Sequence, residues 1–131
     1  MRRNILMVDD NPGDIRLVRE AFGAGPRVAI HEAEDAAHAI EFLENNDCDL
    51  VLLDLSLPRT SGHELLADIR SREPLRALPV VVFSTSDSSD DIERAYAAHA
   101  NCYVTKPGEL DRFLETFRRI EQFWFETARL P

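Results

Sequence analysis

Charged side chains follow three apolar runs of this sequence: Asp9 and Asp10 after the first run, Asp54 after the third and Lys106 after the last. Parallel strands show in a sequence as short, continuous apolar runs, and a parallel sheet binds ligands at the carboxyl ends of its strands. We therefore expect the three carboxylates and the ammonium to meet at one edge of a sheet. Crowded carboxylates repel one another by about 4 kcal/mol per close pair at an effective dielectric constant of roughly 20, so the cluster needs a cation. Its oxygen ligands suit Mg2+.

Hydroxyl side chains end the fourth apolar run. Ser84 and Thr85 bring two hydroxyls and a backbone N–H to the same predicted edge. These residues can also be read as caps of the next helix, and so can Asp9 and Asp10, which precede a helix. Asp54 is harder to explain in that way, because a loop rather than a helix follows it.

Together these side chains describe a site that binds Mg2+ and a phosphoryl group. Asp54 is the candidate nucleophile, because a carboxylate can attack phosphorus and form an acyl phosphate. The metal and Lys106 would offset the charge on the transferring oxygens. Lys106 is the only lysine among 15 basic residues. Either chance left a single lysine here, or the position needs a compact ammonium that a planar guanidinium cannot replace.

The elements that must position these residues alternate along the chain. Strand-like apolar runs cover residues 4–8, 28–31, 50–54, 79–84 and 102–105. Helical patterns cover residues 12–22, 36–44, 62–71, 88–98 and 109–125. This alternation predicts an α/β fold with a doubly wound, five-stranded parallel sheet and five helices on its two faces. No linker or repeat divides the sequence, so we expect one domain over residues 1–131 that ends in a long helix.

The composition argues against several classes of protein. A net charge of −9 and a pI near 4.8 are unlike those of a nucleic-acid-binding surface. No apolar run approaches the length of about 18 residues that a membrane helix needs, and the apolar run before Asp9 is too short for a signal peptide. We therefore expect a cytoplasmic protein without a membrane segment. Cys48 and Cys102 have no CxxC spacing and are expected to be reduced thiols.

Several positions agree in residue type, order and spacing with those of one known family. They are Asp9, Asp10, Asp54, Pro58, Gly62, Ser84, Lys106 and Pro107. Along essentially its whole length, the chain resembles the receiver domain of two-component response regulators, which has a CheY-like, flavodoxin-like fold. Residues 9–22, 53–62 and 101–107, with Phe123 and Trp124, are further similar to the single-domain regulators that serve phytochrome-type histidine kinases.

The resemblance implies which residues bind the metal. Asp54 would be the phosphoacceptor and also a ligand of Mg2+. Asp10 and the main-chain carbonyl of Ser56 would complete the direct ligands, and Asp9 would reach the ion through water. These implied ligands include the same acids that the sequence pattern brings to one edge of the sheet.

The resemblance also implies how the phosphoryl group is bound and sensed. Ser84 and Lys106 would bind its oxygens, and the peptide between Lys106 and Pro107 would be cis. Tyr103 matches the aromatic switch position, but it can also be read as an edge aromatic that packs on a helix. Thr85 stands where the family often has a smaller residue, and it could slow access to the phosphoryl group.

The implied function is that of a stand-alone response regulator, since the residues run out after the fifth predicted helix. A sensor histidine kinase, with a bacteriophytochrome as the expected type, would phosphorylate Asp54, and the phosphorylated form would bind a partner or dimerise. The protein would be no enzyme beyond catalysing its own phosphorylation and dephosphorylation. One alternative is a degenerate receiver that only docks, which the intact acids and lysine oppose. The other is a haloacid-dehalogenase-like phosphotransferase, which would need a second acid two residues after Asp54.

Three consecutive aromatic residues, Phe123, Trp124 and Phe125, stand at the end of the last predicted helix. Adjacent helical residues point about 100° apart, so at least one of the three must be exposed or contact something other than the core. Either the end of the helix folds back on its own domain, or it forms a homodimer through this helix, with or without the fifth strand.

Overall fold

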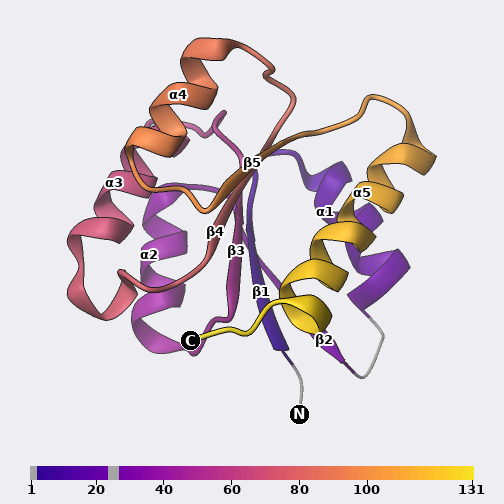
Figure 1. Cartoon of the computed structure of the whole chain (residues 1–131), viewed down its shortest axis with the longest axis horizontal. Helices are drawn as coiled ribbons and strands as arrows, with labels where there is room; N and C mark the ends of the chain where they lie inside the picture. The colour runs from indigo at the N-terminus through magenta and orange to yellow at the C-terminus, as the bar shows by residue number, and fades with distance from the viewer. Residues whose placement is uncertain (1–2, 24–26) are drawn as a thin grey trace.

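The computed structural model describes residues 3–23 and 27–131 and shows one five-stranded sheet with helices on both faces (Figure 1). The strand order is β2-β1-β3-β4-β5, and neighbouring strands are parallel. The predicted α/β, doubly wound fold is therefore confirmed. The predicted domain also includes residues 1–2 and 24–26, which lie outside the described residues.

The strands and helices follow the predicted runs closely. The strands are β1 (Arg3–Val8), β2 (Val28–Ala33), β3 (Leu50–Leu53), β4 (Val80–Ser84) and β5 (Cys102–Thr105). The helices are α1 (Pro12–Val18), α2 (Ala36–Asn45), α3 (Gly62–Ser71), α4 (Ser89–Ala97) and α5 (Leu110–Gln122), with a short 3-10 helix, η2 (Glu73–Leu75), before β4. Apart from the ends of α1 and α5, the observed ends differ from the predicted ones by only one or two residues.

Two of the predicted helices end in wider turns. α1 is continued by a π-helical turn, η1 (Arg19–Gly23), and α5 by another, η3 (Phe123–Thr127). The N–H of Ala128 donates to the carbonyl of Phe123 at 2.6 Å, which is the i to i+5 hydrogen bond of such a turn. Apolar periodicity predicted one uninterrupted helix in each place, because it does not distinguish an α-helix from a short π-helical continuation.

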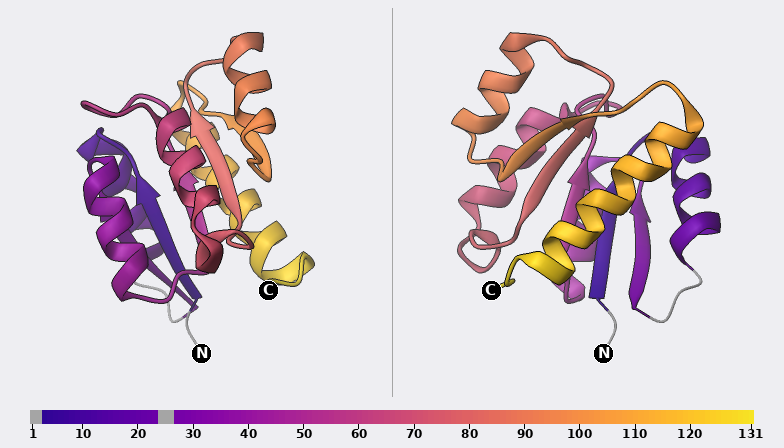
Figure 2. Two further views of the ribbon diagram at one scale, coloured as in Figure 1. Left: turned by 90° about the vertical axis from the view of Figure 1, so that its left-hand side faces the viewer. Right: turned by 45° about the vertical axis from the view of Figure 1, so that its right-hand side comes forward.

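The sheet separates two layers of helices (Figures 1 and 2). α2, α3 and α4 pack on one face, and α1 and α5 pack on the other. Successive residues of β1 alternate between the two cores: Leu6 and Val8 belong to the first, Ile5 and Met7 to the second. This alternation is the two-residue period of a strand, and because both faces are covered, the central strands are apolar throughout.

The strand order places the predicted site at the point where the chain changes direction across the sheet. From β1 the chain goes outward to β2 and then crosses to β3, so that β1 and β3 are neighbours. Val8 pairs with Leu53, and the N–H of Asp54 donates to the carbonyl of Val8 at 2.9 Å. Asp9 and Asp54 therefore lie side by side at the carboxyl edge, where open α/β sheets bind ligands.

Other side chains cap the helices that follow the candidate site residues. Asn11 caps α1 and Ser88 caps α4, each through a side-chain oxygen that accepts backbone N–H groups. The reading of Asp9, Asp10 and Ser84 as helix caps is therefore wrong. Their side chains are left for other contacts at the edge of the sheet.

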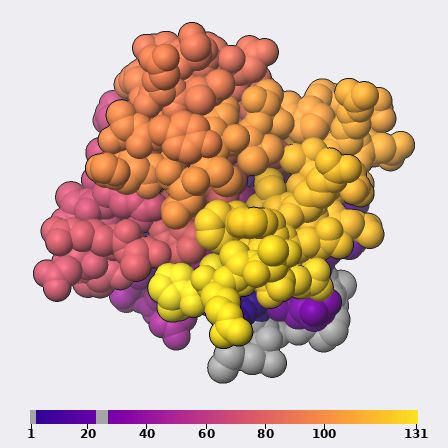
Figure 3. Space-filling model, viewed as in Figure 1, coloured from indigo at the N-terminus to yellow at the C-terminus, as the bar shows by residue number. Residues whose placement is uncertain are grey.

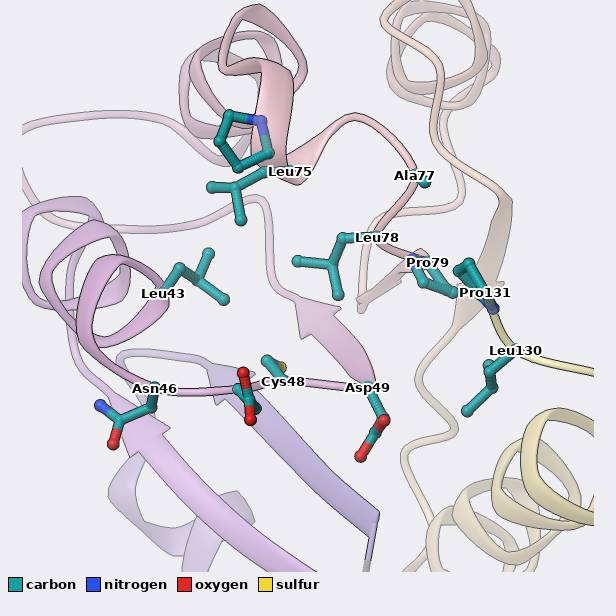
Figure 4. Close-up of a pocket in the computed structure, with 12 residues that line it drawn as sticks. Leu43, Asn46, Cys48, Asp49, Leu75, Ala77, Leu78, Pro79, Leu130 and Pro131 are labelled. Carbon is teal, nitrogen blue, oxygen red and sulfur yellow. The ribbon is translucent and has the colours of Figure 1, made fainter.

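A cleft of about 350 Å3 lies at the opposite edge, where β3 and β4 begin (Figure 4). The end of α2, the segment around η2 and the last two residues of the chain line it, together with Cys48. Burial raises the pKa of Cys48 to about 11, which disfavours the reactive thiolate. Cys48 and Cys102 are both free. None of the predicted site residues lines this cleft.

Among the described residues, no helix combines the length and the apolar character needed to cross a bilayer.

Gly62, the first residue of α3, packs directly on the backbone of the candidate phosphoacceptor. A Cβ atom at this position would lie 2.5 Å from the carbonyl oxygen of Asp54 and 2.6 Å from the Cα of Leu55. We expect Gly62→Ala to lower the free energy of unfolding by about 1–3 kcal/mol, because the clash is with backbone rather than with a flexible side chain. Urea unfolding followed by circular dichroism would measure this change.

Gly108→Ala is the matched control, because no atom of residues 3–23 or 27–131 beyond its chain neighbours lies within 4 Å of the position that its Cβ would take. We expect it to change the free energy of unfolding by no more than about 0.5 kcal/mol. Equal effects of the two substitutions would mean that close packing at Gly62 is not what requires glycine there.

Candidate phosphorylation and metal site

Three acids gather at the carboxyl edge of the sheet, as the sequence predicted. One carboxylate oxygen from each of Asp9, Asp10 and Asp54 lies within 4.8 Å of the others. Asp9 and Asp54 are buried, whereas Asp10 is exposed. Two oxygens that bind one hard cation at about 2.0–2.6 Å can be at most about 5 Å apart, so the three oxygens can share a single divalent ion. The all-oxygen donor set fits Mg2+ or Mn2+.

Lys106 lies among these acids. Its Nζ atom donates hydrogen bonds to Oδ2 of Asp9 at 2.6 Å, of Asp14 at 2.9 Å and of Asp54 at 3.1 Å. Only 3% of its side chain is exposed. An ammonium has three N–H donors, and three carboxylates accept them here. The predicted convergence of the lysine with the acids therefore holds in the structure.

The position of Lys106 is set by the pairing of the last two strands. Ser84 pairs with Thr105, and the backbone N–H of Lys106 donates to the carbonyl of Ser84 at 2.7 Å. The resemblance implied a cis peptide between Lys106 and Pro107, but this peptide is trans. The two isomers of a bond to proline differ intrinsically by only about 0.5–1 kcal/mol, so the sequence at that bond cannot decide between them.

Burial and hydrogen bonding act in opposite directions on the pKa values of Asp9 and Lys106. Burial raises the pKa of Asp9 to about 6, although its hydrogen bond to Lys106 acts in the opposite direction. Burial acts to lower the pKa of Lys106, but the hydrogen bonds to Asp9 and Asp14, together with the negative charges of Asp9 and Asp54, raise that pKa above its usual value. Lys106 is thus held in its charged form, whereas burial disfavours the charged form of Asp9.

Asp14 is a site residue that the sequence reasoning missed. It lies in the first turn of α1, where an acidic residue is ordinarily explained by the helix dipole. In the structure its carboxylate reaches the Nζ atom of Lys106, although the two residues are 92 positions apart in the chain. No local pattern in the sequence signals this contact, because it depends on where α1 packs.

The hydroxyl residues divide between buried and exposed positions. Ser84 is buried at the end of β4, and its Oγ atom accepts the N–H of Ser86 at 3.3 Å. Thr85 is exposed next to it. Ser56, also exposed, donates its backbone N–H to Oδ1 of Asp54 at 3.2 Å. Ser84 and Ser56 are therefore hydrogen-bonded within the two loops that surround Asp54.

Tyr103 links β5 to the loop that follows β4. Its hydroxyl donates to the carbonyl of Ser86 at 2.7 Å, and its N–H donates to the hydroxyl of Tyr96 on α4 at 3.2 Å. The Oγ atom of Ser86 donates to Asp91 at 2.6 Å, and the other carboxylate oxygen of Asp91 lies 3.1 Å from Nε2 of His63 on α3. Tyr103 is thus part of a polar network that starts beside Ser84 and reaches α3 and α4, which the sequence did not predict.

A second polar group joins the loops at the rim of the site. Asp35, which caps α2, accepts hydrogen bonds from the N–H and Nδ1 of His38, both at 2.8 Å, and from Arg59 at 3.1 Å. Arg59 belongs to the loop after β3 and has a positive φ of 66°. The hydrogen bonds from His38 lower the pKa of Asp35, and the hydrogen bond to Asp35 raises the pKa of His38.

The His38–Asp35 pair predicts a pH dependence. The pKa of His38 is raised in the folded state. The pair therefore contributes its full stabilisation of the fold below the ordinary histidine pKa of about 6.5, and this stabilisation is lost as the pH rises through the pKa of His38 in the folded protein. In an NMR titration of the imidazole signals, we expect the midpoint of His38 to lie above 6.5 in the wild type and to fall in Asp35→Asn. Asp47→Asn, an exposed acid in the loop before β3, is the control and should leave the midpoint unchanged. A wild-type midpoint at or below the ordinary value would contradict the pairing.

Comparison with known proteins defines the class of this chain. Residues 5–118 match the response regulator receiver domain, and the chain belongs to this family. It is therefore a signalling protein of the two-component type. The three acids at the edge of its sheet lie close enough together to share a divalent ion.

Particular relatives narrow the comparison. The chain is 38% identical to the response regulator Rcp1 of Synechocystis sp. over 97% of its own length and 92% of that protein. It is also 38% identical to the probable methanogenesis regulatory protein FilR2 of Methanothrix harundinacea, over 97% of this chain and 86% of the relative.

Two solved structures are similar over nearly their whole length. The phosphorylated cyanobacterial phytochrome response regulator RcpA has a TM-score of 0.93 and 39% identity, covering 100% of this chain and 99% of that one. The Mn2+-bound form of Rcp1 has a TM-score of 0.89 and 38% identity, covering 98% of this chain and 99% of that one. Similarity at this level extends through α5 and η3 as well as the sheet.

Proposed function

We propose that this receiver works as a stand-alone response regulator, as one unit over residues 1–131, and accepts a phosphoryl group on Asp54. The observation that carries the proposal is the contact of Asp54 with Lys106 and its place among acids that can share a divalent ion. A buried carboxylate surrounded in this way has little structural purpose, because three acids around one ammonium cost stability unless a ligand compensates them. The match covers 92% of Rcp1 and 99% of the RcpA chain, which supports a response regulator of about this length.

The phosphoryl donor in this proposal is a phosphohistidine of a sensor kinase. An oxygen of Asp54 attacks phosphorus, the O–P bond forms as the P–N bond breaks, and the histidine nitrogen keeps the bonding electrons and takes up a proton. Lys106 and the hydroxyl of Ser84 bind the phosphoryl oxygens, and Thr85 stands exposed beside them at the entrance. RcpA is by name a phytochrome response regulator, which favours a kinase of the phytochrome type, and so a bacteriophytochrome, whereas FilR2 belongs by name to another pathway.

Mg2+ is the proposed cofactor. Asp10 and Asp54 supply carboxylate oxygens that fit it, and the main-chain carbonyl of Ser56 is the further proposed ligand. Asp9, whose carboxylate lies in the same group, is proposed to reach the ion through water. When bound, the ion neutralises charge that develops on the transferring oxygens. The Mn2+-bound form of Rcp1 supports a divalent ion in this position.

The protein is proposed to catalyse only its own phosphorylation and dephosphorylation, and to do so in the cytoplasm. Asp54 is followed by Leu55 and Ser56, so the second acid of haloacid-dehalogenase-type phosphatases is missing. The acids and lysine of the site are in contact with one another, which favours an active receiver over a module that only docks. The net charge of −9 favours proteins rather than nucleic acid as partners.

Phosphorylation is predicted to require both Asp54 and Mg2+. Incubation with a small phosphodonor such as phosphoramidate should add one phosphoryl mass to the wild type, detected by intact-protein mass spectrometry. Asp54→Asn, and the wild type in excess chelator, should show none. Asp47→Asn, which changes an acid at the opposite edge of the sheet, should be labelled like the wild type. Labelling that persists in Asp54→Asn would mean that another residue is the phosphoacceptor.

We further propose that the end of the chain forms a homodimer. Trp124 and Phe125 pack partly against the core on the side of α1 and α5, but Phe123 is 52% exposed. The sequence required at least one exposed aromatic in this run, and Phe123 is that residue. Leu110, at the other end of α5, is 50% exposed. Figure 3 shows α5 and η3 as a continuous surface beside α4, which a second copy could cover.

Phe123 tests this dimer best, because the core does not depend on it. Phe123→Ser should convert a dimer to a monomer in sedimentation at tens of micromolar protein, with an unchanged circular dichroism spectrum. Gln122→Ser, at the adjacent exposed position, should remain dimeric. Beryllofluoride mimics the phosphoryl group. If the wild type is monomeric both with and without it, the proposed homodimer is contradicted.

A further inference from the structure

Lys106 and the predicted metal ion would compete for the same carboxylates. Of the three acids that accept hydrogen bonds from Lys106, Asp9 and Asp54 also belong to the group that fits a divalent ion. A carboxylate oxygen bound to an ion, directly as for Asp54 or through water as for Asp9, is a poorer acceptor for a neighbouring ammonium, and two cations so close repel each other. Binding of the ion must therefore weaken two of the three contacts that hold Lys106.

Asp14 differs from the other two partners of Lys106. It lies outside the group of Asp9, Asp10 and Asp54, and it comes from α1 rather than from a strand end. Its carboxylate is 2.9 Å from Nζ and is 22% exposed. The backbone of Asp14 is fixed as well, because its N–H donates to Oδ1 of the cap residue Asn11 at 3.3 Å. Asp14 is thus an anion on a fixed backbone, and it is not one of the proposed ligands of the ion.

We propose that Asp14 is a positioning residue that retains Lys106 beside Asp54 when a divalent ion binds Asp9 and Asp54. The inference rests on the proposed function, because it concerns the same site. With Asp14 holding one N–H, the ammonium can turn away from the ion and keep another N–H directed toward the phosphoryl group on Asp54. Without Asp14, Lys106 keeps no acceptor among the described residues except the proposed metal ligands, and it competes with the ion for them.

A Mg2+ titration followed by NMR tests this role without any measurement of activity. The amide signals of Asn11 and Ser56 are the readout, because these N–H groups donate to Oδ1 of Asp9 at 2.9 Å and of Asp54 at 3.2 Å. We expect Asp14→Asn to raise the Mg2+ dissociation constant roughly fivefold, the size of coupling common between groups in contact. Asp47→Asn removes the same charge at the opposite edge of the sheet and should change the constant less than about twofold.

Removal of the ammonium shows whether Asp14 acts through it. Lys106→Met should bind Mg2+ more tightly than the wild type, because the competing cation is gone. In that background, Asp14→Asn should change the dissociation constant by less than about twofold, so that the two substitutions are not additive. Asp14→Glu keeps the charge and should restore most of the wild-type affinity. Amide spectra and thermal unfolding show whether each variant is folded. If Asp14→Asn is not folded, Asp14→Ser takes its place in the experiment.

The outcomes separate this inference from the proposed function. If Mg2+ does not shift the signals of Asn11 and Ser56 in the wild type, the proposed metal site itself fails. If the wild type binds but Asp14→Asn binds equally well or more tightly, only the role of Asp14 is overturned. An equal loss with and without the lysine would also overturn it, because Asp14 would then act by general charge or by packing rather than through Lys106.

Discussion

A single buried ammonium faces more carboxylate charge than it can neutralise, and the chemistry of the site depends on this imbalance. Three carboxylates lie within 3.1 Å of Nζ of Lys106, and Asp10 adds a fourth to the same edge. Buried charges that are incompletely paired are costly, and the raised pKa of Asp9 reflects that cost. A divalent ion would neutralise the excess negative charge of the carboxylates, and a phosphoryl group on Asp54 would add negative charge again. Both proposed ligands would therefore act on one set of charges.

The fold creates this imbalance by bringing strand ends together. The crossover between β1 and β3 makes Asp9 and Asp54 neighbours, and the pairing of β4 with β5 directs Lys106 toward them. The strands beneath are among the most fully buried parts of the molecule, so they give the site a rigid base. The loops above it are held by weaker, more exposed polar contacts, such as the pairing of Asp35 with Arg59. The strands at the base are therefore held by more buried contacts than the loops around the site.

One of these loops connects the site to the surface. Ser84 is hydrogen-bonded to Ser86, and Ser86 contacts both Tyr103 and Asp91. These hydrogen bonds connect the Ser84 hydroxyl to α4 and β5, so a displacement of this hydroxyl on phosphorylation would have a route to the surface. The route is a chain of specific hydrogen bonds, and each of its members can be substituted separately.

The sequence by itself determined the alternation of strands and helices, the parallel sheet and the meeting of the three acids with Lys106. It could do so because apolar runs followed by charges are local signals, and parallel strands necessarily gather their carboxyl ends at one edge. Only the tertiary structure decided that Asp14 joins the site, that His63 and Asp91 extend the network of Tyr103, that the bond before Pro107 is trans and that α1 and α5 end in π-helical turns. These features depend on how a helix or loop packs against segments distant in the chain. Spacing in the sequence carries no record of that packing.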